Sequence, residues 1–201
     1  MTWIRTLDYA QSEGKLREIY ARVKGPGDNI DNILKAHSLR PHTLEAHMAV
    51  YKYVLHHHAN RLPKWLLETV GVYVSLLNGC DYCVDHHSAG LARLLGDETR
   101  SATIGAALRA DRPEDAFSGR ELAALRYARL LTREPARLAL ADIDAMRAAG
   151  LDDGEILEVN QVVAYFAYAN RTVLGLGVST KGDILGLSPG DSSDPENWSH
   201  G

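Results

Sequence analysis

The spacing of apolar residues is the feature that most restricts how this chain can fold. Between the glycines and prolines that interrupt the sequence, apolar side chains recur every three or four residues, the repeat of a helix with one buried face. Strand-like alternation of apolar and polar residues is hard to find in any segment. The sequence therefore predicts an all-α, multi-helical fold.

Stop and capping residues set the expected ends of these helices. Gly79 is a stop signal, and Ser118 with Glu121, like Asp152 with Glu155, has the spacing of a capping box. We expect helices at residues 12–23, 41–57, 63–78, 81–96, 97–110, 118–131, 140–149 and 152–176, with a short turn at 33–36.

The length and composition favour one domain. A chain of 201 residues with 45% hydrophobic and 24% charged residues is the size of one compact globular unit. We expect a single all-helical domain over residues 1–187, with two halves that meet near 111–117. Residues 188–201, rich in Ser, Asp, Gly and Pro, are expected to form a loose C-terminal tail.

A weak internal echo relates Glu68 to Glu158, each of which follows a leucine. Twelve residues further on stand Cys80 in the first copy and Asn170 in the second. The echo indicates two related helix pairs, of which only the first has thiols; chance similarity between two helices is the open alternative. We expect Asn170 to satisfy buried polar groups or to pair across a subunit contact.

Charge and hydropathy exclude two classes of partner. The formal net charge of −4 leaves no basic face of the kind that neutralises phosphates, so we expect no nucleic-acid partner. No apolar stretch approaches the roughly 20 residues that span a bilayer, and the N-terminus lacks the features of a signal peptide. The expected location is the cytoplasm, away from membranes.

The two cysteines, Cys80 and Cys83, are the only ones in the chain. Cytoplasmic thiols are held reduced, so a permanent structural disulfide is rare there. A bridge between residues this close would also close too short a loop to stabilise the fold much. Reactivity therefore explains the pair better than a structural role does.

Helix geometry places a base beside one of these thiols. If a helix begins at Asp81, Cys83 lies in its first turn, where free N–H groups and the helix dipole favour a thiolate. His87 is four residues further on, at the roughly 5–6 Å separation typical of neighbours on one helix face. Cys80 precedes the helix and can fold back to meet Cys83.

Glu68 joins this group only if the chain reverses direction. Twelve residues of straight helix would place it about 18 Å from Cys80. A turn at Gly79 between antiparallel helices instead brings Glu68 to about the level of His87. We therefore predict a buried glutamate that orients or deprotonates His87.

The predicted chemistry is a peroxide reduction by a dithiol. Glu68 acts through His87 to raise the thiolate fraction of Cys83, which attacks the terminal oxygen of a small organic hydroperoxide. The resulting sulfenic acid condenses with Cys80 to a disulfide. The candidate catalytic residues are Cys83, Cys80, His87 and Glu68, with neither metal nor cofactor.

Residues 68–87 read ETVGVYVSLLNGCDYCVDHH. Eleven residues separate the glutamate from CDYC, and three residues separate CDYC from the final histidine. In this pattern the chain resembles the carboxymuconolactone decarboxylase superfamily, in particular its AhpD-like alkylhydroperoxidase and peroxidase-related branch. The resemblance covers most of the chain, through Ile33-Leu34, Arg40-Pro41, residues 144–151, Tyr165-Phe166 and Asn170-Arg171.

The resemblance implies roles for the matching residues. Cys83 would be the peroxidatic thiol and Cys80 the resolving one, with Glu68 and His87 as the proton relay. It also implies a metal-free homo-oligomer, a trimer or hexamer, whose disulfide is reduced by a dithiol such as a lipoyl group on an adaptor. The chain departs from the best-studied AhpD proteins at Tyr82, where they have a histidine between the cysteines.

Two other interpretations of the thiol segment and two other functions remain open. Cys80, Cys83, His86 and His87 supply ligand types that zinc accepts, although structural zinc sites take their second pair from a separate segment. The cysteines can also be small buried hydrophobes. In function, the alternatives are a non-catalytic redox-responsive or structural oligomer and, within enzymes, lactone decarboxylation, which needs no vicinal dithiol.

The remaining histidines are assigned no chemistry. The run at 56–58 is expected to end a helix, where partial positive charge suits the dipole. His86 is expected to point away from Cys83, and His37, His42 and His47 are expected at the surface.

Overall fold

The computed structural model describes residues 2–190, 194 and 197–201. Its regular elements within these ranges are all helical, which confirms the all-α prediction. The α-helices are α1 (Gly14–Val23), α2 (Asn32–Ala36), α3 (Pro41–Leu55), α4 (Lys64–Asn78), α5 (Asp81–Leu95), α6 (Glu98–Arg109), α7 (Gly119–Arg133), α8 (Leu140–Ala148) and α9 (Asp153–Leu176). Short 3₁₀ turns lie at Tyr9–Gln11, Pro26–Asp28, Pro113–Asp115 and Pro135–Arg137.

Most helix ends fall within two residues of the predicted ones, and one capping prediction is wrong. Asp152 and Glu155 form the expected box, with N–H to carboxylate distances of 2.8 and 2.9 Å. Ser118 makes no such cap. Gly119, the residue after it, begins α7 with a left-handed φ of +53°, so the chain approaches this helix differently from a standard box.

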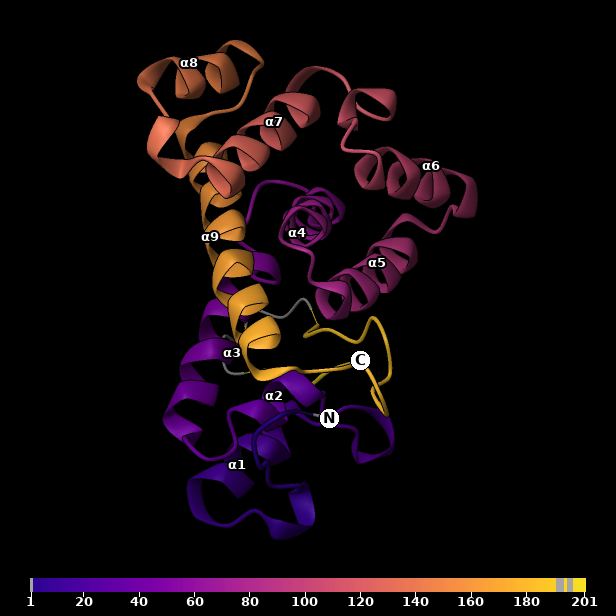
Figure 1. The fold of residues 1–201 in the computed structure, drawn as a ribbon, viewed down its shortest axis with the longest axis vertical. Coiled ribbons are helices and arrows are strands. Elements are labelled where there is room, and N and C mark those ends of the chain that lie inside the picture. The colour runs from indigo at the N-terminus through magenta and orange to yellow at the C-terminus, as the bar shows by residue number, and fades with distance from the viewer. Residues whose placement is uncertain (1, 191–193, 195–196) are drawn as a thin grey trace.

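The hydrophobic helix α4 lies at the centre of the fold. In Figure 1, α5 and α6 lie on one side of α4 and α9 on the other; α1, α2 and α3 gather at one end of the molecule, and α7 and α8 at the opposite end. Helix α4 packs directly against α5, α7 and α9, and residues 66–75 are all buried. Its composition, apolar on every face, is that of a helix enclosed by neighbours.

A tight turn joins α4 to α5 and places the cysteine pair. Gly79 takes a left-handed φ of +68°, a conformation that costs glycine little, and ends α4. Cys80 is the N-cap of α5, and its N–H donates to the carbonyl of Ser75 at 2.9 Å. The two helices run antiparallel from this turn, as predicted from the sequence.

The close contact between α4 and α9 depends on a glycine. A Cβ atom added at Gly71 would lie 2.2 Å from the ring of Phe166, so only glycine fits opposite this side chain. Phe166 is fully buried at this crossing. Further along α9, Asn170 accepts from Asn78 at 2.9 Å and donates to Ser75 at 3.1 Å, so it satisfies buried polar groups as expected.

Two described residues of the C-terminal tail, which was expected to be loose, are buried in the fold. Trp198 is 2% exposed and His200 is 6% exposed. Arg22 stacks on the Trp198 ring at 3.8 Å, and Pro189 and His200 form an isolated bridge. Lys52 donates to the carbonyl of Gly190. An aromatic ring and an imidazole thus anchor a segment whose polar composition indicated disorder; residues 191–193 and 195–196 lie outside the described part.

The fold does not test the expected meeting of two related halves. Residues 111–117 contain the 3₁₀ turn Pro113–Asp115 between α6 and α7, and the meeting of two halves at this point stays a prediction.

Of the described helices, none combines the length and the apolar character that a membrane crossing requires.

Candidate active site

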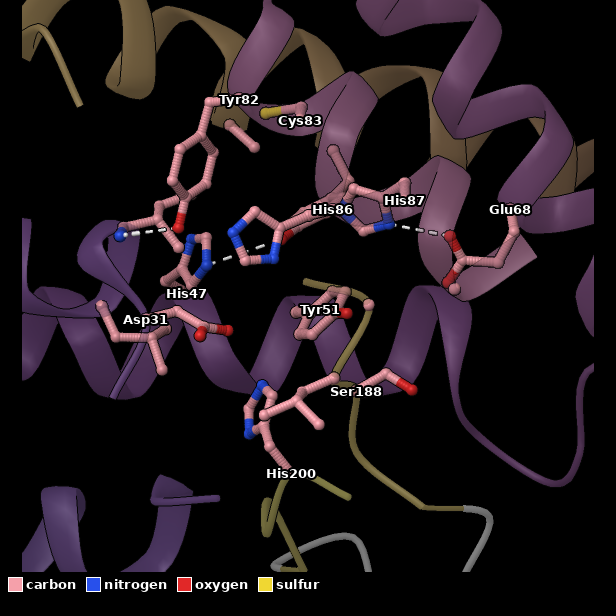
Figure 2. A pocket seen from close by; sticks show the side chains of 17 residues that line it. Asp31, His47, Tyr51, Glu68, Tyr82, Cys83, His86, His87, Ser188 and His200 are labelled. Atoms are coloured by element: carbon pink, nitrogen blue, oxygen red, sulfur yellow. Dashed lines mark hydrogen bonds and ion pairs between the residues drawn. The ribbon is translucent and has the colours of Figure 1, made fainter. Parts of the chain in front are cut away.

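A small buried pocket lies where α2, α3, α4, α5 and α9 meet the C-terminal segment. The cavity volume is about 40 Å³, room for roughly three water molecules. Figure 2 shows Glu68 at one side of the pocket and Asp31 and His47 at the other, with Tyr51 between them.

The two thiols form one unit at the edge of this pocket. Sγ of Cys80 and Sγ of Cys83 are 3.1 Å apart, and both cysteines are free. Cys83 lines the pocket, whereas Cys80 is fully buried behind it. Because a disulfide needs about 2.05 Å, a movement of about 1 Å would join the sulfurs.

The order of thiol acidity differs from the sequence-based expectation that Cys83 is the thiolate. The pKa of Cys80 is lowered chiefly by its hydrogen bond with the Cys83 thiol, and the Cys83 N–H and the Asn170 amide act in the same direction. The pKa of Cys83 is raised well above its usual value by the same thiol–thiol hydrogen bond and by burial. These contacts favour ionisation of the N-cap thiol, Cys80, over the thiol in the first turn.

Glu68 and His87 meet as the antiparallel geometry predicts. Oε2 of Glu68 lies 2.7 Å from Nδ1 of His87, and Glu68 is 2% exposed. The His87 ring packs edge-on against Phe166, with a centroid distance of 4.6 Å. Its Nε2 has no hydrogen-bond partner among the described residues, so this nitrogen is available to a molecule in the pocket.

No direct hydrogen bond joins His87 to Cys83. Within the described ranges, the only hydrogen-bond partner of the His87 ring is Glu68. Both His87 and Cys83 nevertheless line the same pocket. Proton transfer between them therefore requires a bound water or the substrate itself as a bridge.

His56 was missed by sequence reasoning and belongs to this end of the pocket. The expectation that it carries positive charge at a helix end is wrong: α3 ends at Leu55, and His56 turns inward to full burial against the Tyr51 ring, 4.7 Å away. Burial lowers its pKa well below the usual value, so the ring is neutral. Its Nε2 lies 3.7 Å from Oε1 of Glu68.

Residue type does not distinguish His56 from its two neighbours in the histidine run. Its place directly after the last residue of α3 is the one feature that sets it apart. Figure 2 shows Tyr51, another residue of the pocket that the sequence analysis did not single out.

The other end of the pocket is built around His86 and Asp183. Nε2 of His86 is 3.3 Å from Oδ2 of Asp183, to which the Tyr82 hydroxyl donates at 2.8 Å. The same hydroxyl accepts from the Ile33 N–H at 3.2 Å. Asp31 completes this group. Neither aspartate was a sequence-based candidate, because both reach the site through the tertiary fold alone.

Two histidines expected at the surface are buried instead. His47 is 3% exposed and lines the pocket, and burial lowers its pKa to about 3. His37 is 9% exposed, with a pKa also lowered by burial. Their rings lie 5.0 Å apart. A helical face with aromatic neighbours can accept a neutral imidazole, which the residue type alone does not show.

The zinc alternative at the cysteine motif finds no support in the described residues. His87 is bound to Glu68, and His86 to Asp183, so the two rings turn to different carboxylates. The group in this part of the chain whose ligand atoms do converge is Asp31, His86 and Asp183, which contains no cysteine.

Comparison with known proteins relates this chain to a family. The carboxymuconolactone decarboxylase family model matches residues 41–130. An uncharacterised peroxidase-related protein from Silicibacter sp. TM1040 shares 27% identity, covers 73% of this chain and 74% of its own, and has a TM-score of 0.65. The chain is thus similar to the carboxymuconolactone decarboxylase family over somewhat less than half of its length. No curated protein sequence matches it significantly.

Two further structures confirm the AhpD-like fold of this chain. The AhpD-core, peroxidase-related protein from Ralstonia eutropha JMP134 covers 89% of this chain and 91% of its own at 20% identity, with a TM-score of 0.77. The debrominase Bmp8, in its apo form, covers 89% and 90% at 20% identity, with a TM-score of 0.66. The resemblance predicted from the sequence is confirmed at the level of family and fold.

Proposed function

We propose that this chain is a thiol-dependent peroxidase that reduces small hydroperoxides through a Cys80–Cys83 dithiol–disulfide cycle. The observation that carries the proposal is the sulfur pair, 3.1 Å apart, with one member facing a buried pocket and the other behind it. A cavity of about 40 Å³ suits hydrogen peroxide or a short alkyl hydroperoxide better than a bulky substrate. Similarity to a family with peroxidase-related members supports the same activity.

In the first step Cys83 attacks the terminal oxygen of the hydroperoxide. The Cys83 proton passes through a bridging molecule to Nε2 of His87, which Glu68 holds at 2.7 Å through the other nitrogen. The S–O bond forms as the O–O bond breaks, and the leaving alkoxide takes a proton from His87 and departs as alcohol. The sulfur is oxidised to sulfenic acid, and the peroxide is reduced.

The second step uses the buried thiol. Cys80 gives up its proton, and its thiolate attacks Sγ of the sulfenic acid; the S–S bond forms as the S–O bond breaks, and the hydroxide leaves with that proton as water. An external dithiol then exchanges with the disulfide and restores two thiols.

The reductant, assembly and location belong to the same proposal. A dithiol such as a lipoyl group on an adaptor is the reductant class that the family resemblance implies. The proposed assembly is a trimer or hexamer of this chain, in the cytoplasm. We propose no metal for the peroxidase cycle itself.

Peroxide consumption with excess dithiol tests the assignment. Cys83→Ser should abolish turnover, while Cys80→Ser should turn over much more slowly, because its sulfenic acid then depends on direct attack by the external dithiol. Asp85→Asn, an exposed change on the same helix, is the matched control and should retain activity. Wild-type rates in Cys83→Ser would contradict the proposal.

The same assay separates a sensor from an enzyme. A redox-responsive oligomer would oxidise once and then stop even with reductant present, whereas the proposed enzyme continues until the peroxide is exhausted. Lactone decarboxylation, the alternative within the superfamily, would proceed unchanged in Cys83→Ser, since that reaction needs no thiol.

A further inference from the structure

Three segments distant in sequence bring a second set of chemical groups to the pocket. Asp31 is the N-cap of α2, His86 lies on α5, and Asp183 follows α9. One ligand atom from each lies within 4.8 Å of the other two. The relay of Glu68 and His87 uses none of these side chains.

The two acidic side chains of this group are buried. Asp31 is 7% exposed and the Asp183 side chain is 0% exposed. Among the described residues, neither aspartate pairs with a lysine or arginine. One oxygen of Asp31 accepts from Asn29 at 2.8 Å; the other has no hydrogen-bond partner in the described ranges and Asp31 lines the cavity. Two buried carboxylates side by side are costly unless positive charge lies between them.

The separation between His86 and Asp183 suits two ligands of one metal better than a strong hydrogen bond. A charge-assisted hydrogen bond from imidazole to carboxylate is about 2.7–2.9 Å long. The observed 3.3 Å from His86 Nε2 to Asp183 Oδ2 is longer. Two ligands each about 2.0–2.1 Å from a tetrahedral zinc ion are about 3.3–3.4 Å apart.

We propose that Asp31, His86 and Asp183 bind a divalent first-row transition-metal cation. One imidazole and two carboxylates suit zinc and its neighbours in the row, and the two negative charges balance the cation. Asp31 and His86 line the pocket, so a fourth ligand, such as water, would come from the cavity. The site is separate from the dithiol, and its presence departs from the metal-free expectation made from the sequence.

Neighbouring groups hold two of these ligands in place. Tyr82 donates to Asp183 at 2.8 Å, and the Asn32 N–H donates to the same carboxylate at 3.0 Å. Asn29 fixes Asp31. Such outer partners orient metal ligands in known sites. The bound cation would tie α2, α5 and the segment after α9 together around the cavity.

Zinc titration of the Cys80→Ser/Cys83→Ser protein tests the site without interference from thiols. Isothermal calorimetry should show one Zn²⁺ per chain. In the same background, Asp31→Asn, Asp183→Asn and His86→Gln should each weaken binding about tenfold or more. Asp85→Asn, next to His86 but exposed, should leave binding unchanged. Co²⁺ should give visible absorption bands that His86→Gln alters.

Circular dichroism of each variant guards against unfolding. If His86→Gln does not fold, the two Asp→Asn variants, which keep the side-chain shape, decide the matter. No binding in the thiol-free background would overturn the proposal and would mean that the group needs no cation. Binding that survives both Asp→Asn changes would also overturn it, because the zinc would then lie elsewhere. Either result leaves the peroxidase test with wild-type thiols unaffected.

Discussion

His86 and His87 are adjacent in sequence and serve opposite ends of one pocket. His87 turns to Glu68 on α4, 2.7 Å away, at the end that holds Cys83. His86 turns to Asp183, 3.3 Å away, beyond the end of α9. Successive residues on a helix point about 100° apart, so one helix can supply two different sites.

The two ends differ in how their partners are reached. In the thiol end (Glu68, Cys83, His87), Glu68 reaches His87 through one tight turn between two helices, a local arrangement. In the acid end (Asp31, His86, Asp183), Asp183 reaches His86 across a sequence separation of 97 residues, and Asp31 arrives from a third segment. The thiol end is proposed to carry the peroxidase chemistry.

The largest expected effect is at the thiol end. Glu68→Gln removes the carboxylate that holds and polarises His87, and should lower kcat/KM for peroxide by about 100-fold, at the low end of general acid–base contributions. The measurement is steady-state peroxide consumption across pH. Glu158→Gln is the matched control: this residue, the echo of Glu68, accepts from the backbone N–H groups of Arg61 and Leu62, far from the thiols in sequence.

The same experiment can break the comparison between the ends. His86→Gln should cost less activity than Glu68→Gln, since His86 is bound to Asp183 and takes no part in the proposed relay. An equal loss in the two variants would place both ends in one proton relay.

The contrast explains what the sequence could and could not predict. Helix periodicity and stop residues predicted the helices, and Gly79 predicted the reversal that brings Glu68 to His87. The acid end could not be predicted, because no spacing rule links Asp31 or Asp183 to His86. Residue type also misplaced His47 and His56, since an imidazole can be buried neutral or exposed with similar ease.

The order of thiol acidity could not be predicted from the helix start alone. Both cysteines lie at the beginning of α5, and the dipole argument does not choose between them. The choice comes from contacts: the hydrogen bond between the two thiols lowers the pKa of Cys80 and raises that of Cys83, and the Asn170 side chain on α9 lowers both. These are tertiary contacts, outside the reach of local spacing.

The second largest effect is expected at Tyr82, which stands between the cysteines but belongs to the acid end. Tyr82→Phe removes the donor to Asp183 at 2.8 Å and the acceptor of the Ile33 N–H. Hydrogen bonds to buried charged groups contribute roughly 1.5–3 kcal/mol, and we expect a loss of unfolding free energy of that size. Urea denaturation measures it. Tyr168→Phe, at an exposed ring, should cost almost nothing.

Gly71→Ala should disturb the thiol end through the core. The added Cβ would lie 2.2 Å from Phe166, whose ring packs against His87. Overpacking of this kind costs roughly 1–3 kcal/mol and should also reduce turnover by moving His87. Gly175→Ala on the same helix as Phe166 is the control, because its Cβ meets nothing within 4 Å and alanine favours a helix. Equal activity in both variants would show that His87 does not depend on Phe166.

The smallest expected effect is on how the free energy of unfolding depends on pH, and it compares one buried histidine near each end of the pocket. Burial lowers the pKa of His47, on the acid side of the pocket, to about 3, and lowers that of His56 at the thiol end well below its usual value. An unfolded histidine has a pKa of about 6.5, so below that pH the unfolded chain binds protons that the folded chain does not. Stability is therefore complete above about pH 6.5 and falls as the pH decreases toward the folded pKa.

For each buried histidine the loss is about 1.4 kcal/mol per pH unit within this window. The free energy of unfolding, measured by urea denaturation between pH 6.5 and 4.5, should decline less steeply in His47→Gln and in His56→Gln. Each change should remove about 1.4 kcal/mol per pH unit from the slope. His58→Gln, at an exposed position, should keep the full slope. If only His56→Gln flattens the curve, then His47 is protonated in the folded protein and the acid end already holds a positive charge, which would remove much of the electrostatic need for a cation there.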